Sequence, residues 1–195
     1  MRLISIILCA FVASAAIGCQ ETPEFAELKD NRQATIYACG AWAPENLQQI
    51  EAAINDWNTV VGQRYGMNPF VYGGQLADAA SYDENSAGDG MHCIYRLEPD
   101  KLTAFGQEVW NEHRDDSGEA GTFMDNDDIL TYWTLDSSWL PRWALQPIIA
   151  HELGHGAGLD HVDEGDVTPS VMKPLRSAAT VQSADADQFG RIHGC

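Results

Sequence analysis

The segment from residue 151 to residue 161, HELGHGAGLDH, constrains the fold of this chain more than any other. His151 and His155 are four positions apart, so on a helix their side chains lie on one face and can bind one metal ion. Glu152 lies beside them, within reach of a metal-bound water. Gly158 permits a positive φ, which ends the helix and turns the chain so that His161 supplies a third ligand. Three protein ligands leave a fourth position open, which is typical of a catalytic zinc site.

This pattern is far more specific than a single histidine. From average residue usage, a chance match of its five fixed positions at a given start has a frequency of about one in a million. His92, His113 and His193 have no partner at ligand spacing, and we interpret them as surface or hydrogen-bonded core residues. An apolar run, residues 143–150, precedes the motif, and Pro147 suits the first turn of a helix there.

The motif resembles that of the metzincin metalloproteases, and two later segments strengthen the resemblance. Residues 170–174, SVMKP, look like the Met-turn of that clan. The resemblance implies that Met172 forms an apolar floor beneath the zinc without binding it, and the specific similarity covers about residues 143–194. It therefore implies a metzincin-like α+β catalytic domain. Such a domain has a twisted mixed β-sheet and two long helices above a small C-terminal subdomain with a Met-turn and a terminal helix.

The second segment, residues 183–194, is similar to the C-terminal helix of the matrixin branch. Ser183 suits the N-cap of that helix, and Asp185 and Asp187 fall in its first turn, where the helix dipole favours anions. The chain departs from the matrixin pattern at Val162, where a serine usually follows the third histidine, and it has no cysteine-switch segment. The matrixin branch is thus the nearest within the clan.

The ligand set and the resemblance together predict a zinc-dependent endopeptidase that acts on a peptide or protein substrate. His151, His155 and His161 bind zinc, and Glu152 is the general base for a metal-activated water that hydrolyses the peptide bond. Two alternatives use the same residues: a zinc amidase or aminopeptidase, and an anchored binding protein that no longer turns over. The intact Glu152 argues against the binding protein.

The N-terminal residues 1–19 predict a signal peptide for export from a bacterial cell. Residues 16–19, AIGC, resemble a lipobox, in which Cys19 becomes the lipidated first residue and anchors the protein to the outer membrane or cell surface. Cleavage after residues 13–15, ASA, would instead give a soluble secreted protein. Residues 20–33 then form a tether or a propeptide stub, and residues 34–195 form the metalloprotease domain.

The cysteine count depends on that choice. If Cys19 is lipidated, Cys39, Cys93 and Cys195 remain, which allows one disulfide and one free thiol. If Cys19 is retained, four cysteines allow two disulfides. Cys39 and Cys93 both lie in strand-like runs, and we predict that they pair.

The chain is strongly acidic, with 11 basic and 29 acidic side chains and a net charge of −18. This charge argues against nucleic acids and anionic membrane surfaces as partners, because both require a basic face. We therefore expect membrane contact only through a lipid anchor. We also expect the protein to be a monomer.

The remaining elements follow from periodicity and turn residues. Apolar residues from 44 to 61 recur at spacings of three and four, which predicts an amphipathic helix packed on a sheet. Alternating or apolar runs predict strands, and a polar, Gly-rich stretch predicts a long loop. The predicted strands are 34–39, 69–73, 91–97, 120–124 and 129–135, the loop is 78–90, and a short helix is 108–113.

The resemblance implies that residues 120–124 form the edge strand that pairs with an extended substrate. The turn that follows, residues 125–128 with the sequence DNDD, offers the oxygen ligands that calcium takes. It lacks the twelve-residue EF-hand pattern, so we favour a solvated acidic turn over a calcium site.

Overall fold

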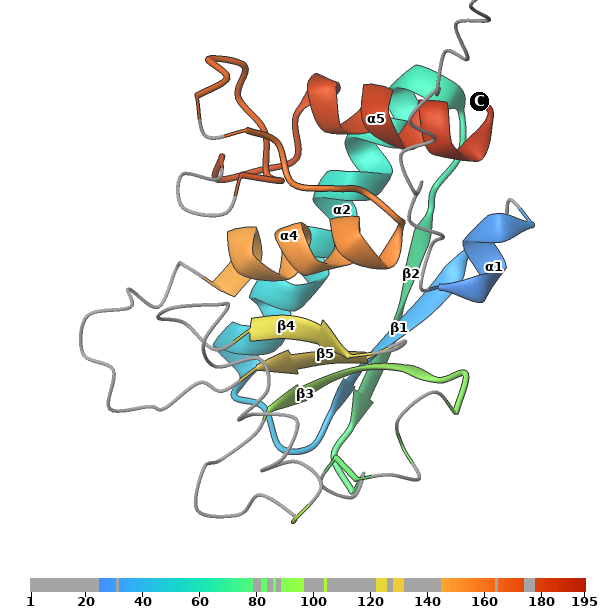
Figure 1. Ribbon diagram of the computed structural model, residues 1–195. Helices are drawn as coiled ribbons and strands as arrows, with labels where there is room; N and C mark the ends of the chain where they lie inside the picture. The colour runs from blue at the N-terminus through green and yellow to red at the C-terminus, as the bar shows by residue number, and fades with distance from the viewer. Residues whose placement is uncertain are drawn as a thin grey trace, which may run out of the picture.

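Helices cover one face of a five-stranded sheet (Figure 1). The computed structural model describes residues 25–30, 32–78, 82–83, 86, 89–96, 104, 122–125, 128–131, 145–163, 165–173 and 178–195. The strands are β1 (Ala34–Cys39), β2 (Phe70–Leu76), β3 (His92–Arg96), β4 (Thr122–Asp125) and β5 (Asp128–Thr131). Their order is β2-β1-β3-β5-β4, and only β4 runs antiparallel to its neighbour, β5. The predicted mixed sheet is therefore confirmed, and β4 is one of its edges.

The helices place the core above the sheet. The described helices are α1 (Ala26–Lys29), α2 (Pro44–Tyr65), α4 (Leu145–Gly156) and α5 (Ser183–His193). Side chains at the predicted three- and four-residue spacing of α2, among them Ile50, Trp57 and Val61, are buried in the core. From the sheet, β1 contributes Ala34 and Ile36 to the same core. The α2 helix runs one turn further than the predicted residue 61.

Helix α4 packs on helix α2. Trp57 Nε1 donates to Ala150 O at 2.8 Å, and Leu145 N, at the start of α4, donates to Gln49 Oε1 at 3.2 Å. Gln146 Nε2 also donates to Asp56 Oδ2 at 2.7 Å. These contacts fix the axial position of α4 on α2, because they engage the backbone and side chains of its first two turns.

Residues 20–33 are predicted to form a tether or a propeptide stub, and from Phe25 onward this segment packs against the domain. Phe25 and Leu28 are 0% and 1% exposed and belong to the hydrophobic core, and Phe25 N donates to Gly156 O at 3.0 Å. Burial of a Phe and a Leu side chain stabilises a docked segment by about 2 kcal/mol each, which a polar tether lacks. The folded domain therefore begins before the predicted residue 34.

The predicted disulfide between Cys39 and Cys93 is confirmed, with Cα atoms 5.6 Å apart on the adjacent strands β1 and β3. Cys195 is a free, exposed cysteine. The solvated interpretation of the acidic turn is wrong at Asp128. That side chain is 0% exposed, and its Oδ1 accepts a hydrogen bond from Cys93 N at 2.8 Å, so it belongs to the sheet.

Several predictions lie outside the described residues. Among them are the signal peptide with Cys19, the helix at 108–113, His113, residues 120–121 and 132–135 of two predicted strands, parts of the predicted loop 78–90, residues 126–127 of the acidic turn, and residue 174 of the Met-turn. No helix in the described part of the chain is long and apolar enough to cross a membrane.

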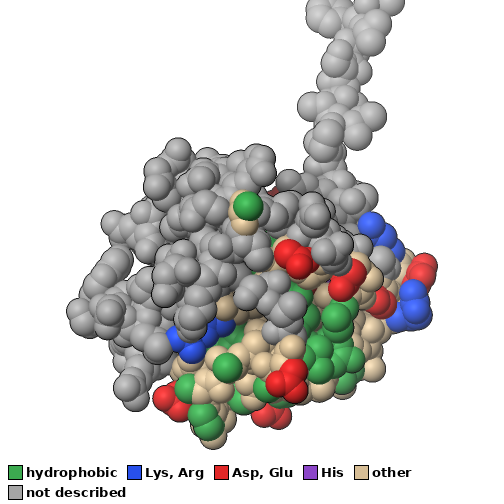
Figure 2. All heavy atoms as spheres, turned by 90° about the horizontal axis from the view of Figure 1, so that it is seen from below, with side chains coloured by type: hydrophobic (Ala, Val, Ile, Leu, Met, Phe, Trp, Pro, Cys, Tyr) green, Lys and Arg blue, Asp and Glu red, His purple; other side chains and the backbone are tan. Residues whose placement is uncertain are grey.

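Figure 2 shows the molecule from below; on the part drawn in colour, hydrophobic side chains lie between separate acidic and basic ones.

Candidate metal centre

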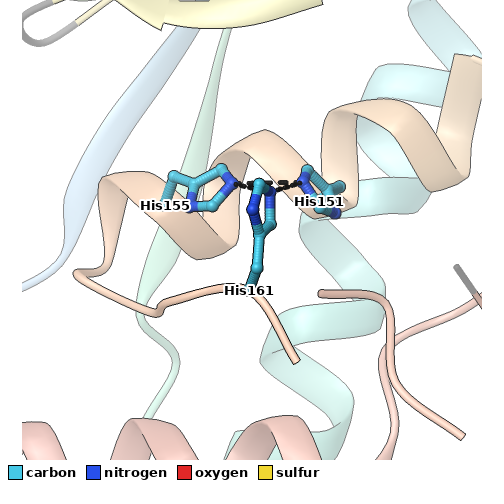
Figure 3. A group of neighbouring side chains, drawn as sticks. All are labelled: His151, His155 and His161. Carbon is cyan, nitrogen blue, oxygen red and sulfur yellow. Dashed lines mark hydrogen bonds between the residues drawn. The ribbon is translucent and has the colours of Figure 1, made fainter. Parts of the chain in front are cut away.

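Three histidine side chains meet beside helix α4. His151 and His155 come from α4, and His161 comes from the segment that follows it (Figure 3). Their Nε2 atoms are 3.1 Å (His151 to His155), 3.1 Å (His151 to His161) and 3.0 Å (His155 to His161) apart. Among the described residues, this is the one group of three or more His, Cys, Asp or Glu side chains that could hold a metal ion. The structure thus brings together all three ligands that the spacing predicts.

The tautomers of two of these rings are set by backbone carbonyls. His151 Nδ1 lies 2.7 Å from Val171 O, and His155 Nδ1 lies 2.9 Å from Leu159 O. A carbonyl oxygen only accepts, so each Nδ1 carries a hydrogen atom and donates it. In the neutral rings, both Nε2 atoms therefore present lone pairs toward the centre of the triad.

The charge state of the rings agrees with this assignment. Burial lowers the pKa of His151. Burial, together with the neighbouring His151 and His161 rings, lowers the pKa of His155 to about 4. Both rings are consequently neutral at neutral pH, which is the form that binds metal.

The triad fits a zinc ion better than a hydrogen-bonded cluster. At most one of the three Nε2 atoms, that of His161, carries a hydrogen atom. The lone pairs of the other Nε2 atoms repel one another unless a cation lies between them. Tetrahedral zinc with Zn–N bonds of about 2.0–2.1 Å sets its nitrogens about 3.3 Å apart. The observed separations of 3.0–3.1 Å are close to that value.

The predicted turn after α4 is confirmed. Gly158 has a φ of +82°, in the left-handed region. Gly158 N donates to His155 O at 2.7 Å and Leu159 N donates to Gly154 O at 2.9 Å, which is the pair of bonds of a Schellman motif. The chain then returns, and Val162 N donates to Met172 O at 3.0 Å. This bond fixes the backbone next to His161.

Met172 is buried against α4, and its role as a floor beneath the zinc, which the resemblance implies, stays a prediction. It is 0% exposed, and it packs against α4 at Gly154. A Cβ at Gly154 would overlap Met172 Sδ and lie 3.1 Å from Trp57 Cζ2. The glycine in the middle of the motif is therefore needed for the close approach of Met172 and Trp57, a role that the sequence analysis missed.

A buried carboxylate holds the segment that carries Met172. Asp185, in the first turn of α5, is 1% exposed. Its two oxygens accept from Ser170 Oγ at 2.5 Å, from Val171 N at 3.1 Å and from Gln182 N at 2.7 Å. Because Val171 O in turn accepts from His151, Asp185 is linked to a residue of the triad through the backbone of Val171.

Two predictions for α5 need adjustment. The helix N-cap is Gln182 rather than the predicted Ser183, which is the first helical residue. Asp185 forms a capping box with Gln182, so its carboxylate stabilises the helix start as well as the Met172 segment. Asp187 instead pairs with Arg64 of α2.

Glu152 is a buried acid on the helix that carries His151 and His155. It lies on α4 next to His151, is 7% exposed, and burial raises its pKa to about 8. Such a carboxyl is mostly protonated at neutral pH in the metal-free chain, and a nearby cation favours its charged form. The pKa of Glu152 is therefore close to neutral pH, which suits a group that both takes up and releases a proton.

The remaining described histidines behave as predicted. His92 is 4% exposed and its Nε2 lies 2.7 Å from Glu27 Oε2, while His193 contacts two backbone carbonyls. Neither belongs to the triad.

A comparison with protein-family models finds none that matches this chain, and the search of curated proteins likewise finds no match.

Proposed function

We propose that this chain is a zinc-dependent endopeptidase with a metzincin-like catalytic domain. The observation that carries the proposal is the convergence of three Nε2 atoms within 3.0–3.1 Å of one another, two of them on rings whose Nδ1 atoms donate to carbonyls. Anchoring of the second ring nitrogen is typical of metal-binding histidines. A surface cluster of histidines has no need of such anchors.

His151, His155 and His161 would hold the zinc ion, and no fourth protein ligand occurs in this group among the described residues. A zinc ion with three protein ligands supplies a Lewis acid that polarises a carbonyl and lowers the pKa of water to about 7. This open position favours a catalytic over a structural role.

Glu152 would be the general base. It takes a proton from the water that attacks the scissile carbonyl and passes it to the leaving amine. Its burial supports this role, because a pKa of about 8 in the metal-free chain falls toward neutrality when a cation is bound nearby. A carboxyl exposed to solvent would be a weaker base.

Strand β4 would bind the substrate. It is an edge of the sheet, antiparallel to β5, and it contacts α4, the helix that carries His151 and His155. An extended peptide can add to such an edge through main-chain hydrogen bonds. The scissile bond would then lie along the helix that carries the metal ligands.

Export supports the same proposal. The Cys39–Cys93 disulfide is expected in an oxidising compartment outside the cytoplasm. We propose that the protein is exported and anchored through a lipid on Cys19, or secreted in soluble form, and that it acts as a monomer. Radiolabelled palmitate incorporation in wild type and Cys19→Ser separates the two fates.

The test of the function is zinc content and casein cleavage of the protein from residue 20 onward, with Glu152→Gln alongside. The account predicts one zinc per chain in both proteins and cleavage lost to chelator. In Glu152→Gln the rate should fall on the order of 100- to 10,000-fold. Full activity of Glu152→Gln would overturn the assignment of the base. Stoichiometric zinc without cleavage of internal peptide bonds would favour an amidase or aminopeptidase.

A further inference from the structure

The end of helix α4 is tied to two other elements just before the turn that leads to His161. Gly156 O accepts from Phe25 N at 3.0 Å, and Ala157 O lies 3.0 Å from His193 Nε2. The last carbonyls of a helix have no partner within the helix, so such external donors decide how firmly it ends. Here the donors come from α1 and α5, which are far apart in the sequence.

His193 bridges two carbonyl groups. Its Nδ1 lies 3.1 Å from Leu28 O, and its Nε2 lies 3.0 Å from Ala157 O. A carbonyl oxygen only accepts, so both ring nitrogens must donate. A neutral imidazole has one N–H and can satisfy one carbonyl only. The geometry therefore requires the doubly protonated, positively charged ring.

The surroundings of His193 suit a cation. It lies in the last turn of α5 and contacts Ala157 O, just past the end of α4, and the C-terminal ends of helices favour positive charge. Its ring centroid is 4.2 Å from that of Phe189. The stack leaves both ring nitrogens directed at the two carbonyls.

The charged groups of the packed elements have other partners. Glu27 on α1 is bound to His92, Asp187 on α5 is paired with Arg64, and Asp185 binds the Met172 segment. The other described charged or titratable side chains of these three helices are Lys29 on α1, His151, Glu152 and His155 on α4, and Arg191 on α5. No carboxylate is thus a hydrogen-bond partner of His193 among the described residues, and its partners are the two carbonyls.

We infer that His193 is a positioning residue of the metal centre, which as an imidazolium clamps Leu28 O and Ala157 O and so holds the turn that delivers His161. The inference rests on the proposed zinc site and adds a residue that contacts neither metal nor ligands. Ala157 directly precedes Gly158, so a loosened end of α4 changes the path to His161 first. His151 and His155 lie within the helix and are held independently.

The test compares zinc affinity, measured by competition with a chromophoric chelator, in wild type and His193→Phe. Phenylalanine keeps a ring against Phe189 and removes both donors. Arg191→Gln is the matched control, because it removes one positive charge from the same helix at an exposed position. Substitution of a group that hydrogen-bonds a metal ligand lowers metal affinity by about 10–100-fold. His193 contacts the turn and not a ligand itself, so we expect His193→Phe to lower zinc affinity by about tenfold.

A second measurement tests the two hydrogen bonds of His193 directly. Long-range proton–nitrogen NMR spectra of the wild type should show a hydrogen atom on each of the two ring nitrogens, Nδ1 and Nε2.

Each outcome separates the inference from the proposed function. Equal zinc affinity of wild type and His193→Phe overturns the inference alone, as does a His193 ring with a hydrogen atom on only one of its two nitrogens. A loss confined to thermal stability of the zinc-free variant, with unchanged zinc affinity, assigns His193 a structural role and also overturns it. A wild type that binds no zinc overturns both. If His193→Phe does not fold, His193→Gln and the NMR measurement decide.

Discussion

Helix α4 and the segment after it supply the three proposed zinc ligands in two different ways. His151 and His155 are partly buried on a helix, and each is anchored through Nδ1 to a backbone carbonyl. His161 is exposed and lies on an irregular segment, where Gly158 and the bond from Val162 N to Met172 O set its position. His151 and His155 are thus positioned by packing and by hydrogen bonds to the backbone, whereas His161 is positioned by the turn at Gly158 and the backbone bond that follows it.

The difference indicates where the site is vulnerable. The helical pair lies among buried groups whose substitution changes the stability of the protein. The third ligand depends on a turn whose change costs little stability but alters the geometry of the site. Four substitutions, from the largest expected effect on stability to the smallest, test this division.

Glu152→Gln should have the largest effect on the helical side, in the zinc-free protein. The pKa of Glu152 is raised from 4.5 to about 8, so the folded chain holds a proton that the unfolded chain loses as pH rises. Stability of the wild type therefore declines between these two pH values. We expect zinc-free Glu152→Gln to be more stable by about 4 kcal/mol above about pH 8 and no different near about pH 4, measured by urea unfolding. Identical unfolding curves at both pH values would contradict the buried acid.

Asp185→Ala should loosen the anchor of His151. It leaves buried donors on Ser170 and Val171 without their acceptor, which costs about 3 kcal/mol. Zinc affinity should fall about tenfold, because Val171 O orients the His151 ring. The control is Asp187→Ala on the same helix, whose partly exposed pair with Arg64 contributes about 0–1 kcal/mol. Equal effects of the two substitutions on zinc affinity would contradict the proposed role of Asp185 in positioning His151.

Gly154→Ala should displace α4 from Met172. The added methyl group overlaps Met172 Sδ, and such overpacking costs about 1–3 kcal/mol even though alanine favours a helix. In a Met172→Ala background the cost should be largely relieved, since the overlapping sulfur is gone. Thermal unfolding of the four proteins of this cycle gives the coupling. Additive effects would show that Met172 does not pack on the helix as described.

Gly158→Ala should act on the third ligand. A left-handed alanine costs about 1 kcal/mol, and the same cost applies at Gly66, the left-handed residue at the end of α2. Gly158→Ala should weaken zinc binding, whereas Gly66→Ala should leave it unchanged at equal loss of stability. A competition titration with both variants measures this. Unchanged zinc affinity in Gly158→Ala would mean that His161 does not depend on the turn.

The local half of this architecture could be predicted from the sequence. The spacing of His151 and His155 and the turn at Gly158 follow from residue periodicity and from positive-φ glycine. The strand pattern predicts a strand at residues 120–124, and the resemblance implies its edge position. The helix at Pro44–Tyr65 and the Cys39–Cys93 pair were also within reach, because apolar spacing and strand-like runs are local features.

The rest depends on contacts between distant segments. Asp185 was interpreted as a helix-dipole acid, but its partners at Ser170 and Val171 exist only in the folded chain. The burial of Phe25 and Asp128 likewise requires α4 and β3 to be in place, so polar surroundings in the sequence misled both predictions. The two-carbonyl contact of His193 has no sequence signal, since its acceptors are backbone atoms.

The most direct test of the central claim is X-ray absorption at the zinc edge on the wild type and on His161→Ala, each loaded with one equivalent of zinc. The account predicts a four-coordinate ion in the wild type, with three imidazole nitrogens and one further light atom at about 2.0–2.1 Å. His161→Ala should retain the two imidazoles of the helix. A wild-type spectrum with sulfur ligands, or one that His161→Ala leaves unchanged, would contradict the three-histidine site.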